Sequence, residues 1–139
     1  MEKSAPYQVV EANKTIDHIG EVNEMVERRW NMFEINGIDW DIEWCSPTDD
    51  NLRRSDGRLT VGMTDNRTKC IYLSDRLSGD FLRKVCAHEL VHCFCFSYNV
   101  LMDIDEEEFM ADWISRYGEE LVYLLDDIMR GILRKAYIA

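Results

Sequence analysis

The chain has 139 residues, of which 46% are hydrophobic and 31% charged, and its net charge at pH 7 is −11. This length and composition predict one globular domain over residues 1–139. The excess of acidic groups excludes nucleic acid and anionic membranes as favoured direct partners, because phosphate binding needs a basic face. We find neither an apolar stretch of about 18 residues nor a signal peptide, which predicts a cytoplasmic protein.

The N-terminal part of the sequence predicts an arm followed by a helix. Residues 1–14 have no hydrophobic period and are expected to form a partly ordered arm. From about Thr15 onward, apolar residues recur at the spacing of a core-facing helix. These residues are Ile19, Val22, Val26, Trp30 and Phe33. The pair Asn36-Gly37 is expected to end this helix.

The middle of the chain predicts a small antiparallel sheet. Residues 38–44 alternate strictly between apolar and acidic side chains, which is typical of a strand with one buried face. Residues 59–63 alternate in a similar way, and residues 70–73 return after a turn, so we expect a hairpin. The segment 58–64 is a candidate edge for binding an extended peptide. An ordinary hairpin that covers the core fits the same residues equally well.

The segment 85–96 reads VCAHELVHCFCF and predicts a buried helix whose strongly polar residues are His88, Glu89 and His92. Buried imidazoles and carboxylates need partners. Positions i and i+4 share a helical face, so the two histidines can bind one divalent metal ion, most often zinc. Glu89 lies at the edge of that face, where it can take a proton from attacking water. A coincidental pair of core histidines is the alternative.

Helical phase also limits the third metal ligand, since a catalytic zinc usually has three protein ligands. His18, the remaining histidine, lies far upstream, so a carboxylate or cysteine is expected. Glu108 is the favoured ligand and Glu107 its rival. Asp112, one turn after Glu108, is expected to accept the second N–H of His88 or His92. The competing interpretation is a solvated acidic run at a helix N-terminus.

The remaining elements are two C-terminal helices, one ending near Tyr117 and one running from about Glu119 to Tyr137, with Gly118 between them. The five cysteines are Cys45, Cys70, Cys86, Cys93 and Cys95. Their odd number and spacing favour neither a disulfide framework nor a second zinc site.

The sequence HELVH at residues 88–92, followed by EFMAD at 108–112, resembles the gluzincin metallopeptidases. The chain from residue 58 to 118 is most similar to the small ImmA/IrrE-like metallopeptidases of bacteria, their phages and mobile elements. This resemblance implies a zincin-like α+β fold and zinc held by His88, His92 and Glu108. It also implies that repressor-like regulatory proteins are the substrates. Phe109 departs from the family pattern, which has a small residue after the ligand glutamate.

These observations favour a zinc-dependent endopeptidase that acts on a protein or peptide, with Glu89 as the catalytic base. Tyr98, Arg116 and Tyr117 are candidates for stabilising the oxyanion, although each fits a structural role better. A metal-binding sensor or interaction module with little proteolytic activity is the alternative from another class. A hydrolase of non-peptide amides would carry the same ligand pattern.

Overall fold

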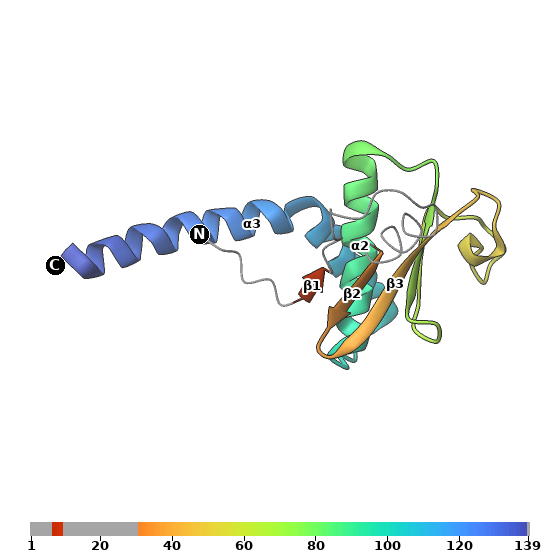
Figure 1. Cartoon of the computed structure of the whole chain (residues 1–139), viewed down its shortest axis with the longest axis horizontal. Helices are drawn as coiled ribbons and strands as arrows, with labels where there is room; N and C mark the ends of the chain where they lie inside the picture. Colours follow the sequence, from red (N-terminus) through yellow and green to blue (C-terminus); the bar gives the residue numbers. More distant parts are fainter. Residues whose placement is uncertain (1–6, 10–30, 139) are drawn as a thin grey trace, which may run out of the picture.

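The protein, described here by a computed structural model over residues 7–9 and 31–138, has an α+β fold. Within those ranges a five-stranded mixed sheet packs against the first of two helices (Figure 1). The strands are β1 (Tyr7–Val9), β2 (Met32–Ile35), β3 (Ile38–Cys45), β4 (Gly62–Asp65) and β5 (Cys70–Ser74). The helices are the 3-10 turn η1 (Asp50–Leu52), α2 (Gly79–Ser97) and α3 (Ile104–Ile138).

The β2–β3 hairpin corrects the expectation of a helix that continues to Phe33 and ends at Asn36-Gly37. Residues 32–35 form a strand in which Phe33 and Ile35 are buried and their neighbours exposed. Asn36 and Gly37 both have positive φ angles, as a two-residue hairpin turn requires. This turn pairs Ile35 with Ile38. The rest of the expected helix, and most of the expected arm, lie outside the described residues, whereas Tyr7–Val9 of the arm form β1.

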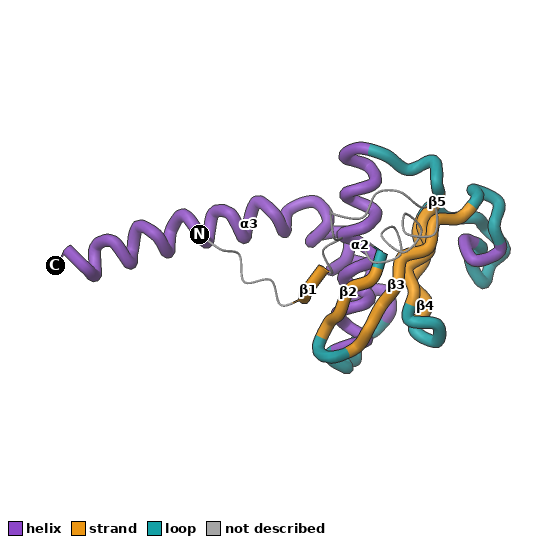
Figure 2. The backbone as a smooth tube through the Cα atoms, in the orientation of Figure 1, coloured by secondary structure: helices purple, strands orange, loops and turns teal. Residues whose placement is uncertain are grey.

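The sheet has the strand order β1-β2-β3-β5-β4 (Figure 2). The β4–β5 hairpin is antiparallel, as predicted from the sequence. However, β3 and β5 run parallel, so the expectation of a purely antiparallel sheet was wrong. The sequence does not distinguish parallel from antiparallel pairing here. Alternation of apolar and polar residues shows which face of a strand is buried but not which strands are neighbours. The order leaves β4 at one edge of the sheet, in contact with α2.

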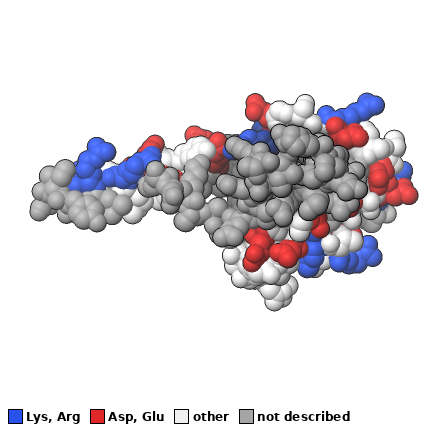
Figure 3. All heavy atoms as spheres, in the orientation of Figure 1, with Lys and Arg blue, Asp and Glu red and all other residues white. Residues whose placement is uncertain are grey.

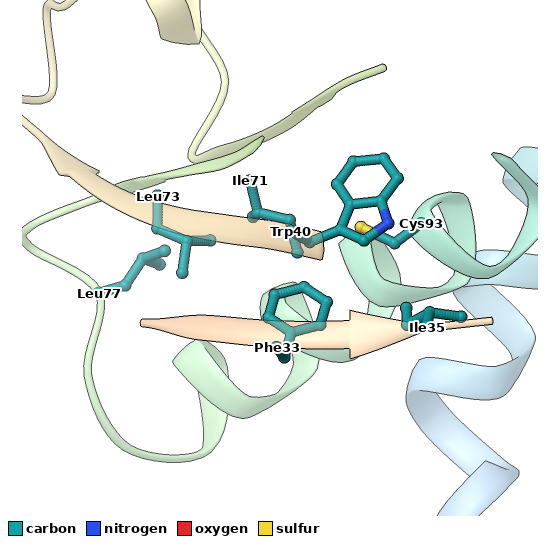
Figure 4. Packing of buried hydrophobic residues seen from close by; sticks show 7 residues of the cluster. All are labelled: Phe33, Ile35, Trp40, Ile71, Leu73, Leu77 and Cys93. Carbon is teal, nitrogen blue, oxygen red and sulfur yellow. The ribbon is translucent and has the colours of Figure 1, made fainter. Parts of the chain in front are cut away.

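The main core lies between the sheet and α2 (Figure 4). Trp40 from β3 and Cys93 from α2 are fully buried there, next to Ile71 of β5. The Trp40 Nε1–H donates a hydrogen bond of 2.8 Å to the Ser97 hydroxyl at the end of α2. A smaller cluster around Leu52 and Tyr72 contains the opposite side chains of the sheet. The sheet therefore packs along α2 from Leu82 and Val85 to Ser97 at its C-terminus.

The ends of α2 follow sequence signals. Ser78, a residue type favoured at helix N-caps, occupies the N-cap position, although its side chain makes no capping hydrogen bond. Asn99 has a φ of 53°, and the Val100 N–H donates to the Cys95 carbonyl at 2.8 Å. The Asn99 N–H also reaches the Phe96 carbonyl, at 3.3 Å. These two bonds form a Schellman motif, which ends the helix and turns the chain back toward α3.

The C-terminal part forms one helix of 35 residues instead of the two that the sequence predicted. Gly118 does not interrupt it, because a glycine inside a helix costs only about 1 kcal/mol relative to alanine. The first part of α3 packs along α2, and the second part extends away from the sheet (Figure 1). Among the described residues, no helix is long and apolar enough to cross a membrane.

Candidate metal centre

Two helices bring three potential metal ligands together. His88 and His92 share one face of α2, and their Nε2 atoms lie 3.3 Å apart. Glu108, from the first turns of α3, places its carboxylate oxygens 3.2 Å from His88 Nε2 and 3.0 Å from His92 Nε2. These three residues form a group that could hold a metal ion. The sequence expectation named the same three residues, and the structure places their donor atoms together.

The other nitrogen of each histidine is held by a second carboxylate. His92 Nδ1 lies 2.7 Å from Glu107, which is buried, and His88 Nδ1 lies 2.9 Å from Asp112, which is half exposed. A neutral imidazole that donates from Nδ1 presents the lone pair of Nε2. Both histidines are therefore set to accept a cation through Nε2. The Asp112 contact agrees with the sequence expectation, and Glu107, considered there as a rival ligand, contacts His92 instead.

The spacing of the three donors fits a tetrahedral metal. Ligands at about 2.0–2.1 Å from a tetrahedral ion lie about 3.3 Å from one another. The observed separations are 3.0, 3.2 and 3.3 Å. Two nitrogen lone pairs and a carboxylate in such proximity would repel one another without a cation between them. The donor set, two imidazoles and one carboxylate, is one that zinc accepts while keeping a fourth position open.

Glu89 lies next to this group but is held by another element. Its carboxyl is 3.9 Å from His88 Nε2 and accepts a hydrogen bond of 2.9 Å from the Thr64 hydroxyl of β4. Burial raises the pKa of Glu89, while the hydrogen bond from Thr64 and the nearby histidines oppose that rise. The result is a carboxyl with a raised pKa, which is suited to exchanging a proton.

The close contact between β4 and α2 depends on Gly62. A Cβ atom at Gly62 would lie 2.7 Å from Val85 Cγ1, a distance that real Cβ atoms essentially never show, and 3.2 Å from Glu89 Cγ, which is also tight. The glycine thus lets the edge strand approach the helix closely enough for Thr64 to reach Glu89. The sequence alone identified neither Gly62 nor Thr64 as a residue of the site. A glycine within an alternating strand is a signal of such close approach.

A pocket of about 570 Å³ opens over the three donors. It is lined on one side by residues 60–64, which include the first three residues of β4, and on the other by residues of α2 and α3. Among the described residues β4 pairs only with β5, so its second edge is unpaired beside a pocket that its residues line. Of the three candidates for oxyanion stabilisation, Arg116 lines the pocket, whereas Tyr98 and Tyr117 do not.

The cysteines take no part in the group of donors. All five are free, and four of them are buried. His18 lies outside the described residues.

Comparison with known proteins gives no relative from which a role could be carried over. The chain matches no family model, no curated protein and no solved structure.

Proposed function

We propose that this protein is a zinc-dependent endopeptidase with a zincin-like fold. The observation that carries the proposal is the convergence of His88, His92 and Glu108 beside the buried Glu89. A site that only held a metal for stability would need ligands but would gain nothing from a buried glutamate next to them. The open pocket above the three donors supplies the space that a substrate needs.

Zinc bound to these three residues would supply a Lewis acid that polarises a carbonyl and lowers the pKa of water. The protein residues supply positioning and proton transfer. Glu89 is placed to take a proton from the attacking water and to deliver it to the leaving amine. Thr64 keeps one Glu89 oxygen engaged at 2.9 Å, which fixes the direction of the other oxygen.

The second edge of β4 is the proposed binding surface for the substrate backbone. An extended peptide could add to this edge through main-chain hydrogen bonds, which bind without regard to side-chain identity. Thr64 belongs to the same strand, so a peptide bound there would lie directly over Glu89. The resemblance to ImmA/IrrE-like metallopeptidases supports a cytoplasmic regulatory protein as substrate.

Substitution of Glu89 tests the proposed chemistry. Glu89→Gln keeps the size of the side chain and removes its ability to accept a proton. We expect it to bind zinc in a 1:1 ratio, as the wild type does, and to lose at least about 100-fold in peptide cleavage. Cleavage is measured by mass spectrometry on a mixed peptide library, and zinc by elemental analysis. Glu106→Gln, at an exposed position outside the pocket, is the matched control.

The outcomes separate the proposal from its rival. Cleavage by Glu89→Gln at the wild-type rate would contradict the role of Glu89. A wild-type protein that binds zinc and cleaves no peptide in the library would instead identify a metal-binding sensor.

A further inference from the structure

Three basic side chains line the pocket without a partner among the described residues. They are Arg54 from the loop after η1, Lys84 from α2 and Arg116 from α3. None of them makes an ion pair or a side-chain hydrogen bond within residues 7–9 and 31–138. By contrast, the arginines that precede Arg54 and Lys84 in the sequence form ion pairs, Arg53 with Asp50 and Arg83 with Glu119. In a chain of net charge −11, three unpaired cations around one pocket are unexpected.

The pairing of the two helices places two of these cations opposite each other. His92 faces Glu108, and His88 faces Asp112, which shows that α2 and α3 run antiparallel. One turn further along both helices come Lys84 and Arg116. The Arg83–Glu119 ion pair shows that the helices still face each other there. Like charges that face each other across two helices repel, so their presence calls for another explanation.

The acidic residues of the pocket form no ion pair with these cations. Glu107, Glu108 and Asp112 contact the two histidines, and Glu89 accepts its hydrogen bond from Thr64. The three cations therefore remain able to pair with an anionic group of a ligand.

We infer that Lys84 and Arg116, with Arg54 lining the same pocket, bind a carboxylate of the substrate peptide. This inference rests on the proposed peptidase function and adds the class of substrate. Four residues of a helix rise about 6 Å along the axis, which is roughly the length of two residues of an extended peptide. The carboxylate thus belongs about two or three residues from the bond that is cut, on the side toward the N-terminus of α2. It is either an Asp or Glu side chain or the C-terminal carboxylate of the peptide.

Peptide arrays test this inference separately from catalysis. Zinc-loaded Glu89→Gln protein is bound to immobilised decapeptides in which each position is Asp, Asn or Lys in turn. We expect Asp to bind about tenfold better than Asn at one position, the value of one hydrogen bond to a charged group. In a second array, with free and with amidated C-termini, a preference confined to free ends assigns the carboxylate to the terminus.

Substitutions on the same Glu89→Gln background identify the residues. Lys84→Gln and Arg116→Gln should each remove most of the preference for Asp, and Arg116→Glu should favour Lys instead. Arg134→Gln is the matched control, since Arg134 is exposed on α3 and does not line the pocket. Equal binding of Asp and Asn peptides together with equal binding of free and amidated C-termini, or a preference that survives these substitutions, overturns the inference. A preference for Asp combined with no cleavage by the wild type leaves it standing and overturns the proposed peptidase function.

The second half of α3 supports an independent inference. From Leu121 to Ile132 its large apolar side chains are between 41% and 58% exposed. Those that recur at i, i+3, i+4, i+7 and i+11 form one stripe along the helix, called here the distal stripe, consisting of Leu121, Leu124, Leu125, Ile128 and Ile132. Helices in proteins gain most of their stability from packing of such an apolar stripe, and the distal stripe lacks that packing among the described residues.

The charges beside the distal stripe indicate its partner. Glu120 and Asp126 precede Arg134 and Lys135 along α3. Among the described residues these four side chains form no ion pair, whereas Glu119 pairs with Arg83 and Asp127 pairs with Arg130. Figure 3 shows the basic side chains toward the free end of α3 and acidic ones nearer the body. Two copies of α3 that pair antiparallel place the acidic part of each against the basic part of the other. We infer that the distal stripe forms a two-fold symmetric interface with a second copy of this chain.

Sedimentation equilibrium of the full chain tests this interface. We expect a dimer at micromolar concentration that Leu125→Lys converts to a monomer, because a lysine in the stripe buries an unpaired charge. Val122→Lys adds the same charge on the flank of the helix and should leave the dimer intact. A monomeric wild type, including one in which the N-terminal segment covers the stripe, overturns the inference, as does a dimer that Leu125→Lys does not weaken.

Discussion

At the scale of single residues, the carboxylates behind the two histidines set how tightly the site binds zinc. Glu107 is buried and contacts His92 Nδ1 at 2.7 Å, whereas the side chain of Asp112 is 59% exposed. We expect Glu107→Ala to weaken zinc binding by about 10- to 100-fold. Asp112→Ala should cost less, because water can replace an exposed carboxylate. Competition with a chelator of known affinity measures both, and Glu106→Ala is the control. A larger loss for Asp112→Ala would contradict this ranking.

Thr64 is expected to influence catalysis through Glu89. Thr64→Val keeps the shape of the side chain but removes the hydroxyl that lowers the pKa of Glu89. The pKa of Glu89 should then rise further, so that the acid limb of the kcat/KM profile moves to higher pH. Zinc affinity should not change, because Thr64 contacts no metal ligand side chain. Thr64→Ser keeps a hydroxyl and should restore the profile. An unchanged acid limb in Thr64→Val would show that Thr64 does not act through Glu89.

The residues that sequence could identify are those linked by helical periodicity. His88 and His92 are one turn apart, and so are Glu108 and Asp112, which makes their shared faces readable from spacing alone. The contact of Glu107 with His92 depends on how α2 and α3 pair. Helical phase alone could identify Glu107 only as a rival of Glu108 for the metal. Thr64 belongs to a strand 25 residues before Glu89, so only the packing of β4 on α2 reveals it.

At the scale of elements, the contact between β4 and α2 is the point where a small change should matter most. Gly62→Ala places a methyl group 2.7 Å from Val85 Cγ1 and forces the strand away from the helix. We expect a loss of about 1–3 kcal/mol in the free energy of unfolding, together with reduced cleavage. Urea denaturation measures the first effect. Gly131→Ala is the control, since no atom lies within 4 Å of its added Cβ, and it should stabilise the helix by about 0.5–1 kcal/mol. Equal stability of Gly62→Ala and wild type would show that β4 can shift without cost.

The errors made from sequence at this scale have a common cause. Residues 32–35 fit both a helical and an alternating spacing of apolar side chains. The Asn36-Gly37 pair that follows is a strong signal for a hairpin turn and therefore favours a strand. Gly118 was expected to end a helix because glycine is common at helix ends. No residue after it supplies a turn, and the flanking segments are helical in phase, so the helix continues. Local sequence preference thus predicts the wrong element where the same residues fit two kinds of secondary structure.

At the scale of the whole molecule, the cysteines report on folding. Burial raises the pKa of Cys70 to about 12 and that of Cys95 to about 11, so both remain protonated thiols at pH 8 in the folded state. We expect iodoacetamide to label them slowly in native protein and fast in urea. Because the folded pKa values are raised, their share of stability is complete below about pH 9, the unfolded value, and is lost as pH rises toward 11–12. Fast labelling of native protein at pH 8, traced by peptide mapping to Cys70 or Cys95, would contradict the burial.

Metal removal should destabilise the whole domain, because the site joins α2 to α3. Without a cation, the carboxylates of Glu89, Glu107, Glu108 and Asp112 are concentrated around two histidines in a chain that is already strongly acidic. A ligand that binds only the folded state at about 1,000 times its Kd adds about 4 kcal/mol, which corresponds to a shift in Tm of roughly 8–16 °C at this size. Thermal unfolding with and without a chelator measures the shift.

Zinc should restore the Tm and magnesium should not, because magnesium prefers oxygen ligands. The control is His88→Ala, in which chelation should change the Tm little. If a chelator leaves the Tm of the wild type unchanged, in protein first shown to contain zinc, the metal does not link the two helices.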